Sequence, residues 1–361
     1  MITGYNSDGE GVARLDDGRV VFVRGSARGD EAEVRLIKEQ KNVAWAVIIR
    51  ISNPSQHRIQ PDCPYYPQCG GCDFRHITYE EELFAKMQCV NDALLRIGGL
   101  SNRIDRILHT GQINGYRNKA VLHSSGSSLG FYGNRSNDVI TIDRCLLLKD
   151  DINYKLKNLI GSGKKRKDDI ILRSGRNGTN QPLEEELDGL IFKLDGFFQV
   201  NTDAALLLFN KAREYAALSK TEILIDLYCG VGALTLFVGR DAQYAVGVEQ
   251  NPGAVKTARE NARQNGLTHI NFINTDVAKW IPDIISPDCI IVDPPRKGLS
   301  QSAINKILEL SPKRIVYISC NPSTLARDLK LLDKYSVNNI CAIDMFPRTA
   351  NIECCCSLEQ N

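Results

Sequence analysis

The chain has 361 residues, which predicts two or three domains with enough sequence to bury a core. It contains no apolar run long enough to cross a bilayer and no signal-peptide pattern, which argues against a membrane protein and leads us to expect a cytoplasmic one. The net charge is only +2, but residues 101–180 hold 15 Lys or Arg against 7 Asp or Glu, which predicts that a polyanionic partner binds there.

The first 54 residues carry short alternating runs of the kind that form a small antiparallel barrel. The runs are Val20–Val23, Ala32–Ile37 and Ala44–Ile49, with turns at Asp16–Gly18 and Ala27–Asp30. Glycines and charges also recur in a fixed pattern, at Gly9–Arg14, Val23–Gly25 and Gly29–Val34. This pattern resembles the TRAM domain, an OB-like barrel that binds RNA.

A cysteine-rich loop follows the predicted barrel. In the expected compartment the 12 cysteines should not form disulfides, so metal ligation, catalysis and packing are the remaining roles. Cys63, Cys69 and Cys72 form a C-x5-C-x2-C run among prolines and glycines, which predicts a metal or cluster site. Cys89 lies in a helical pattern where packing explains it, so Cys145 is the preferred fourth ligand. Ligand type alone leaves zinc and a [4Fe–4S] cluster both open.

The basic middle of the chain interleaves aromatic and cationic residues in Gly115–Ala120 and Gly130–Ser136. This pattern suits single-stranded RNA, whose bases stack on rings while its phosphates meet cations. An ordinary solvated strand edge has about equal weight as an interpretation. Residues 161–169 contain four consecutive basic residues and predict an exposed turn.

Strands and helices alternate from about residue 191. The segment Ile223–Thr235 predicts a buried strand, a Gly-rich turn and the start of a helix. Glu249 ends the next strand, 19 positions after Gly230, where a nucleoside ribose would present its two hydroxyls. Asp276 follows a third strand. Together these residues predict a nucleoside cofactor.

The choice of cofactor depends on Asp226, which begins the Gly-rich turn. The turn lacks the third glycine of the NAD fingerprint. A carboxylate at this position is a poor neighbour for a pyrophosphate and a good one for the amino group of methionine, which favours S-adenosylmethionine. Asp293 ends another strand and should enter the same crevice. Methyltransferases that act on exocyclic amines resemble this segment but have an aromatic residue at the position of Arg296. Amine methylation is therefore disfavoured.

Cys320 follows the apolar run Arg314–Ile318, so it should lie at the carboxyl end of a buried strand. A helix predicted over Leu325–Leu332, capped by Ser323 or Thr324, would lower the pKa of this thiol and favour the nucleophilic thiolate. A buried packing residue is the alternative, and this stretch alone favours it by about two to one.

The whole chain resembles the RNA uracil-C5 methyltransferases, in particular the iron–sulfur members with an N-terminal TRAM domain that modify 23S ribosomal RNA. The motifs that carry the resemblance are Cys63, Cys69, Cys72 and Cys145, Phe197–Asn201, Asp226–Gly232, Asp293–Arg296, Ser319–Asp328, Phe346–Pro347 and Ile352–Glu353. Two departures are a short segment between Cys145 and Phe197, and Asn351 in place of a usual His.

The resemblance implies an α/β fold with a Rossmann-like S-adenosylmethionine domain at 191–361. This domain would follow the TRAM-like barrel at 1–54 and an α+β central domain with a cluster loop at 55–190. It also implies that Cys320 is the nucleophile, that Glu353 is the general base and that the four cysteines hold a [4Fe–4S] cluster. The implied cofactor contacts are Gln199, Tyr228, Glu249 and Asp293, to which the residue pattern adds Asp226, Gly230 and Asp276.

The expected reaction explains these residue types. C5 of uracil is a poor nucleophile, so a thiolate first adds to C6, C5 then takes the methyl group, and a base removes the C5 proton. Ribosomal RNA is the expected substrate, and the same chemistry on tRNA is the alternative. A second alternative is an RNA-binding scaffold without activity, which the presence of cofactor motif, thiol and base disfavours. No motif implies a protein partner, so we expect a monomer.

Overall fold

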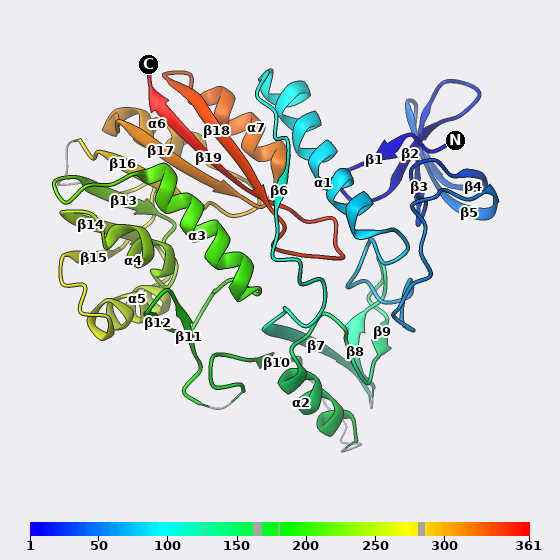
Figure 1. The fold of residues 1–361 in the computed structure, drawn as a ribbon, viewed down its shortest axis with the longest axis horizontal. Coiled ribbons are helices and arrows are strands. Elements are labelled where there is room, and N and C mark those ends of the chain that lie inside the picture. The colour runs from blue at the N-terminus through cyan, green and yellow to red at the C-terminus, as the bar shows by residue number, and fades with distance from the viewer. Residues whose placement is uncertain (127, 162–167, 180, 281–285) are drawn as a thin grey trace. The chain divides into compact units, whose positions relative to one another are not determined.

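The computed structural model describes residues 1–126, 128–161, 168–179, 181–280 and 286–361 (Figure 1). Most of the basic turn predicted at 161–169 lies outside these residues. The described residues form two compact units, one of residues 1–90, 112–172 and 346–351, and the other of residues 91–111, 173–345 and 352–361. The predicted division into three domains stays a prediction. In the part of the chain that the structure describes, no helix is both long and apolar enough to span a bilayer.

The first unit begins with a five-stranded sheet in the order β1-β2-β3-β5-β4. Its strands are β1 (Gly4–Tyr5), β2 (Gly11–Arg14), β3 (Val20–Arg24), β4 (Glu31–Glu39) and β5 (Val43–Asn53). Alternate residues point inward, and Ala13, Val21, Val23 and Ala46 pack in its core. β3 and β5 pair in parallel, unlike the antiparallel arrangement predicted, because the β4–β5 hairpin places β4 at the sheet edge and returns β5 beside β3.

The same unit contains a four-stranded sheet in the order β10-β7-β8-β9. Its elements are β7 (Lys119–Ser125), β8 (Ser128–Tyr132), β9 (Val139–Thr141), α2 (Asp150–Gly161) and β10 (Ile170–Arg173). Helix α2 packs on this sheet through Ile152 and Leu156. β8 and β9 approach so closely at Gly130 that a Cβ there would lie 1.9 Å from the carbonyl oxygen of Ile140. Helix α1 (Tyr79–Ala93) leads from this unit into η1 (Leu94–Gly98).

The second unit is built on an eight-stranded sheet in the order β15-β14-β13-β16-β17-β19-β18-β6 (Figure 1). The strands are β6 (Ile107–Leu108), β13 (Ile223–Leu227), β14 (Tyr244–Glu249), β15 (Ile270–Asn274), β16 (Cys289–Val292), β17 (Arg314–Ser319), β18 (Tyr335–Ile343) and β19 (Glu353–Gln360). β13 to β17 pair in parallel with one another, and their apolar runs are buried as expected for a sheet covered on both faces. β19 runs antiparallel between β17 and β18.

The helices of this unit are α3 (Thr202–Ala216), α4 (Ala233–Gly239), α5 (Pro252–Gln264), α6 (Gln301–Leu310) and α7 (Pro322–Leu331). A hairpin of β11 (Glu184–Leu187) and β12 (Leu190–Lys193) precedes α3. The predicted start of α7 was wrong by three residues. Asn321 caps this helix by accepting the N–H groups of Ser323 and Thr324, and Pro322 at the first position has its φ preset for a helix.

Candidate active site

The Gly-rich turn after β13 requires unusual backbone angles. Tyr228, Gly230 and Gly232 have φ of 67°, 54° and 78°. A Cβ on Gly232 would lie 2.7 Å from the ring of Phe272, so only glycine fits there. Tyr228 tolerates the left-handed conformation while its N–H donates to the carbonyl of Val248 at 2.9 Å. The turn leads directly into α4, as predicted.

Glu249, at the end of β14, is tied to this turn. Its carboxylate accepts the N–H of Gly230 at 3.2 Å and that of Asn251 at 2.7 Å. Asp276 follows β15. Burial raises the pKa of Tyr228, and the charge of Asp276 raises it as well. The residues predicted for a nucleoside are therefore gathered at the carboxyl ends of β13, β14 and β15, which is the edge where open α/β sheets bind ligands.

Asp226 is buried at the carboxyl end of β13. One carboxylate oxygen accepts the hydroxyl of Thr235 at 2.5 Å, whereas the other has no hydrogen-bond partner among the described residues. Burial, with smaller contributions from the charges of Asp293 and Glu249, raises the pKa of Asp226 to about 7, although the hydrogen bond from Thr235 opposes this shift. An unpaired, buried acceptor favours a cationic ligand. Asp226 thus fits the ammonium group of S-adenosylmethionine.

Gln199 is buried in a loop that Arg173 holds. The Arg173 guanidinium donates to the carbonyls of Leu194, Gly196 and Phe198 at 3.0, 2.7 and 3.2 Å. At Gly196 a Cβ would lie 2.9 Å from a methyl group of Val231, so this loop lies directly against the Gly-rich turn. Arg173 was not singled out in the sequence. A lone arginine at the end of a strand gives no sign that three distant carbonyls will surround it.

The register of β17 and β19 brings Cys320 and Glu353 together. Ser319 pairs with Cys354 in this antiparallel ladder, so Cys320 and Glu353 occupy the next opposing positions. Asp293 follows β16, the parallel neighbour of β17. Burial, and then the charge of Asp293, raises the pKa of Glu353 well above its ordinary value. The thiol and two carboxyl groups therefore share one edge of the sheet.

The prediction that the pKa of Cys320 is lowered was wrong in direction. Burial raises the pKa of this thiol, and the charges of Glu353 and Asp293 raise it further, while Arg296 opposes them. The N-terminus of α7 is outweighed because two carboxylates in a poorly hydrated site disfavour a third negative charge. Arg296 is the cation that favours the thiolate.

The loop with Asp293 and Arg296 is fixed to the start of α7. The carbonyl of Arg296 accepts the side-chain amide of Asn321 at 3.2 Å and the hydroxyl of Thr324 at 3.4 Å. Asp328 accepts the N–H of Leu299 at 2.7 Å. One set of contacts therefore positions both the loop after β16 and the helix after Cys320. This role of Asn321 and Asp328 could not be predicted from the sequence, because their partners lie 25 and 29 residues away.

The four predicted cluster cysteines lie in the first unit. Burial raises the pKa of Cys69 and of Cys72. The charge of Cys145 raises both, that of Cys63 raises the pKa of Cys69, and that of Cys69 raises the pKa of Cys72, so these thiols lie near one another. Arg75 donates from Nε to the sulfur of Cys72 at 3.3 Å. Among the described residues, however, no three His, Cys, Asp or Glu side chains are arranged to hold a metal ion. The structure therefore does not show the predicted cluster site.

The two predicted RNA-contacting strands differ in what they expose. Tyr116 is buried and donates its hydroxyl to the carbonyl of Pro347 at 2.9 Å, so its ring cannot stack on a base. Tyr132 is 41% exposed and stacks on His123 with ring centroids 3.7 Å apart.

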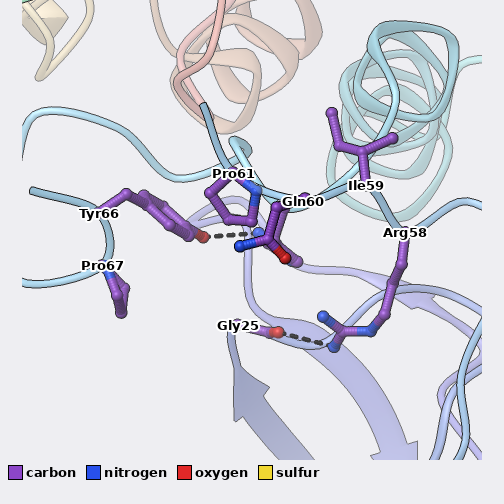
Figure 2. Close-up of a pocket in the computed structure, with 8 residues that line it drawn as sticks. Gly25, Arg58, Ile59, Gln60, Pro61, Tyr66 and Pro67 are labelled. Carbon is purple, nitrogen blue, oxygen red and sulfur yellow. Dashed lines mark hydrogen bonds between the residues drawn. The ribbon is translucent and has the colours of Figure 1, made fainter. Parts of the chain in front are cut away.

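A separate cavity of about 520 Å³ in the first unit is lined by residues that include Gly25, Arg58 and Tyr66 (Figure 2). No residue predicted for the cofactor or for methyl transfer lines this cavity.

The sheet order, the Gly-rich turn and the acidic residues at one edge define a methyltransferase fold. Comparison with known proteins agrees. Residues 197–316 match the methyltransferase small domain, residues 1–49 the TRAM domain, and residues 283–361 the tRNA (uracil-5-)-methyltransferase family.

Two relatives are named uncharacterized RNA methyltransferases. The one from Clostridium tetani is 31% identical over 98% of this chain and 94% of its own length. The one from Synechocystis is 32% identical over 98% of this chain and 93% of its own. The chain belongs to the RNA (uracil-5)-methyltransferase family, and the predicted TRAM barrel and methyltransferase fold are confirmed.

A solved structure is also similar over nearly the whole chain. It is the tRNA (uracil-54, C5)-methyltransferase of Pyrococcus abyssi in complex with S-adenosyl-L-homocysteine. The TM-score is 0.79 at 25% identity, over 99% of both chains. The shared methyltransferase fold supports S-adenosylmethionine as the cofactor. The family and the TRAM domain support RNA as the substrate.

Proposed function

We propose that this protein methylates C5 of a uridine in RNA, with S-adenosylmethionine as the methyl donor. The observation that supports it most is the register of β17 and β19, in which Ser319 pairs with Cys354 and the next residues are Cys320 and Glu353. The charges of Glu353 and Asp293 also act on the Cys320 thiol. A thiol and a carboxyl group at one site are the nucleophile and the base that C5 methylation needs.

In the proposed reaction the thiolate of Cys320 adds to C6, and the C5=C6 electron pair moves to C5. C5 then takes the methyl group of the sulfonium of S-adenosylmethionine. The S–CH3 bond breaks with its electron pair left on sulfur, so that S-adenosylhomocysteine is the leaving group. Glu353 removes the C5 proton, the electrons of that C–H bond restore C5=C6, and the C6–sulfur bond breaks to release the thiolate. The net change replaces the C5 hydrogen by a methyl group and releases one proton.

The proposed cofactor contacts divide by chemistry. Asp226 would accept the ammonium group, and Glu249 the ribose hydroxyls. Further contacts are proposed from Gln199, Tyr228, Gly230, Asp276 and Asp293. Support comes from the unpaired oxygen of Asp226 and from the N–H groups that orient the Glu249 carboxylate.

Two classes of RNA are candidates for the substrate. We propose 23S ribosomal RNA, in line with the sequence resemblance, and place the protein in the cytoplasm with its substrate. Transfer RNA is the second candidate, favoured by the name of the similar Pyrococcus abyssi enzyme. Mapping 5-methyluridine in ribosomal and transfer RNA from cells with and without the gene separates them. Loss of the modification from neither RNA would contradict the proposal.

We also propose that Cys63, Cys69, Cys72 and Cys145 hold a [4Fe–4S] cluster, with zinc as the alternative. Support comes from the thiolate donor set, from its spacing, and from the charge of Cys145, which raises the pKa of both Cys69 and Cys72. These residues take no part in the proposed reaction steps.

A further inference from the structure

A strained and buried residue precedes the strand that carries Glu353. Arg348 has a φ of 70° and is only 6% exposed. A long side chain in this left-handed conformation costs about 1–3 kcal/mol and persists only where the surroundings fix it. Such residues gather at functional sites, so the contacts that hold Arg348 are informative.

Both backbone groups of Arg348 are held. Its N–H donates to the Glu82 carboxylate at 2.7 Å. Its carbonyl accepts the N–H of Asp73 at 2.9 Å and that of Phe74 at 3.2 Å. The guanidinium donates to the carbonyl of Ile77 at 3.2 Å. The strained conformation is therefore fixed from the backbone as well as from the side chain.

The residues around Arg348 are held in the same way. Asp73 accepts the N–H of Ala350 at 2.8 Å. The carbonyl of Pro347 accepts the hydroxyl of Tyr116 at 2.9 Å, and that of Phe346 accepts the Lys86 ammonium at 3.2 Å. We call residues 346–351 the strap. Asp73 directly follows Cys72, so the end of the cysteine loop is one of its anchors.

We propose that the strap positions Glu353 for removal of the C5 proton, with Arg348 and Asp73 as positioning residues. The inference rests on the proposed function. Glu353 opens β19 only three residues after Ala350, so the strap holds the chain immediately before that strand. A base must lie within hydrogen-bond reach of the proton it removes, and a displacement of about 1 Å can cost on the order of 10²-fold in rate.

This role predicts a defect in one step. Attack by Cys320 and methyl transfer both precede deprotonation, so a displaced Glu353 would leave them largely unaffected. Removal of the C5 proton, re-formation of C5=C6 and departure of the Cys320 thiolate would slow together. The methylated RNA would then remain attached to the enzyme.

The test compares Arg348→Val with Arg348→Gly in the full-length protein. Both remove the guanidinium, but glycine accepts a φ of 70° whereas a β-branched valine resists it. With RNA and methyl-labelled cofactor, Arg348→Val should accumulate a labelled covalent adduct and lose turnover on the order of 10²-fold. Arg348→Gly should release product at least about tenfold faster than Arg348→Val, since it avoids the strain.

A second pair tests the other anchor. Asp73→Ala should accumulate the adduct, whereas Asp73→Asn retains an oxygen that can accept the N–H of Ala350 and should restore release. Asp30→Ala is the matched control, because Asp30 is also buried in the first unit and accepts the N–H groups of Ala27 and Ser55 at 2.6 and 2.9 Å. It should lose stability without adding adduct per folded molecule.

The inference is overturned if Arg348→Val and Asp73→Ala show the same ratio of adduct to product as Asp30→Ala. It is also overturned if valine and glycine at position 348 behave alike while Asp73→Ala releases product normally. Absence of 5-methyluridine from reactions of both the parent enzyme and Glu353→Gln would instead overturn the proposed function, and the role of the strap with it.

Discussion

At the residue scale, Asp226 is the proposed cofactor contact whose burial lowers the stability of the folded protein. Its carboxyl group is buried, and one oxygen has no hydrogen-bond partner among the described residues. Because burial raises its pKa to about 7, the folded protein holds a proton that the unfolded chain releases nearer pH 4. Stability therefore falls as pH rises from about 4 through 7.

We predict that Asp226→Asn stabilises the protein at pH 8 by something on the order of a few kcal/mol, because no charge remains to be buried. At pH 4 the two proteins should be nearly equal, since the parent carboxyl is then protonated. The same substitution should weaken S-adenosylmethionine binding, because the ammonium group loses its anionic partner. Urea unfolding at both pH values and calorimetric titration measure these effects. Equal stability at pH 8 would contradict the account.

Cys320 and Glu353, the proposed nucleophile and base, also have raised pKa values. The pKa of each is raised by burial and by neighbouring carboxylates. In the proposed reaction the thiol has to lose its proton before it adds to C6, and the charge of Arg296 favours this loss. Titratable groups that perturb one another are typical of catalytic centres.

At the scale of elements, the sequence pattern correctly predicted the strand, turn and helix around Asp226–Gly232. It also correctly predicted that Glu249 ends the next strand. Buried parallel strands have continuous apolar runs, and a turn that needs positive φ needs glycine, so both leave local patterns. The N-cap of α7 was misplaced because Asn321, Ser323 and Thr324 are all good capping residues, and only the backbone geometry decides among them.

Long-range contacts could not be predicted in this way. The Arg173 guanidinium donates hydrogen bonds to carbonyls more than twenty residues away, and the backbone of Arg348 is held by residues near position 80. The direction of the Cys320 pKa shift also depended on β19 returning beside β17, which places Glu353 opposite the thiol. Each of these follows from tertiary packing and leaves no periodic or spaced signal in the sequence.

The Gly-rich turn offers a test at this scale. Gly232→Ala must place a Cβ 2.7 Å from Phe272 in a left-handed conformation. We expect the free energy of unfolding to fall by about 1–3 kcal/mol more than the backbone strain alone would cost, because the Phe272 ring is packed. We also expect weaker cofactor binding. Gly266→Ala is the control, since Gly266 has a φ of 68° but nothing within 4 Å of its Cβ position. Equal losses in urea unfolding would show that close packing at the turn is unimportant.

At the scale of the whole molecule, the two units divide the predicted chemistry. The second unit holds the residues proposed for the cofactor and for methyl transfer, and the first holds the TRAM barrel and the four cysteines. Residues 346–351 belong to the first unit although the strands before and after them belong to the second. The chain therefore returns to the first unit just before it reaches Glu353.

The cluster proposal is tested on the intact protein. We expect a brown preparation containing iron and sulfide, whose visible absorbance is lost in Cys63→Ser and in Cys145→Ser, because each removes one thiolate ligand. Cys89→Ser should keep the colour, since Cys89 lies on α1 and is not a proposed ligand. A colourless parent protein with one zinc ion per chain and no sulfide would identify zinc as the resident metal.

The most direct test of the central claim is the fate of labelled RNA on Glu353→Gln. If Glu353 only removes the C5 proton, attack by Cys320 and methyl transfer should still occur. Denaturing gels with methyl-labelled cofactor should then show a covalent enzyme–RNA band, and turnover should fall by something on the order of 10²–10⁴-fold. The double variant with Cys320→Ala should show no band. Normal turnover by Glu353→Gln without a labelled band would contradict the account.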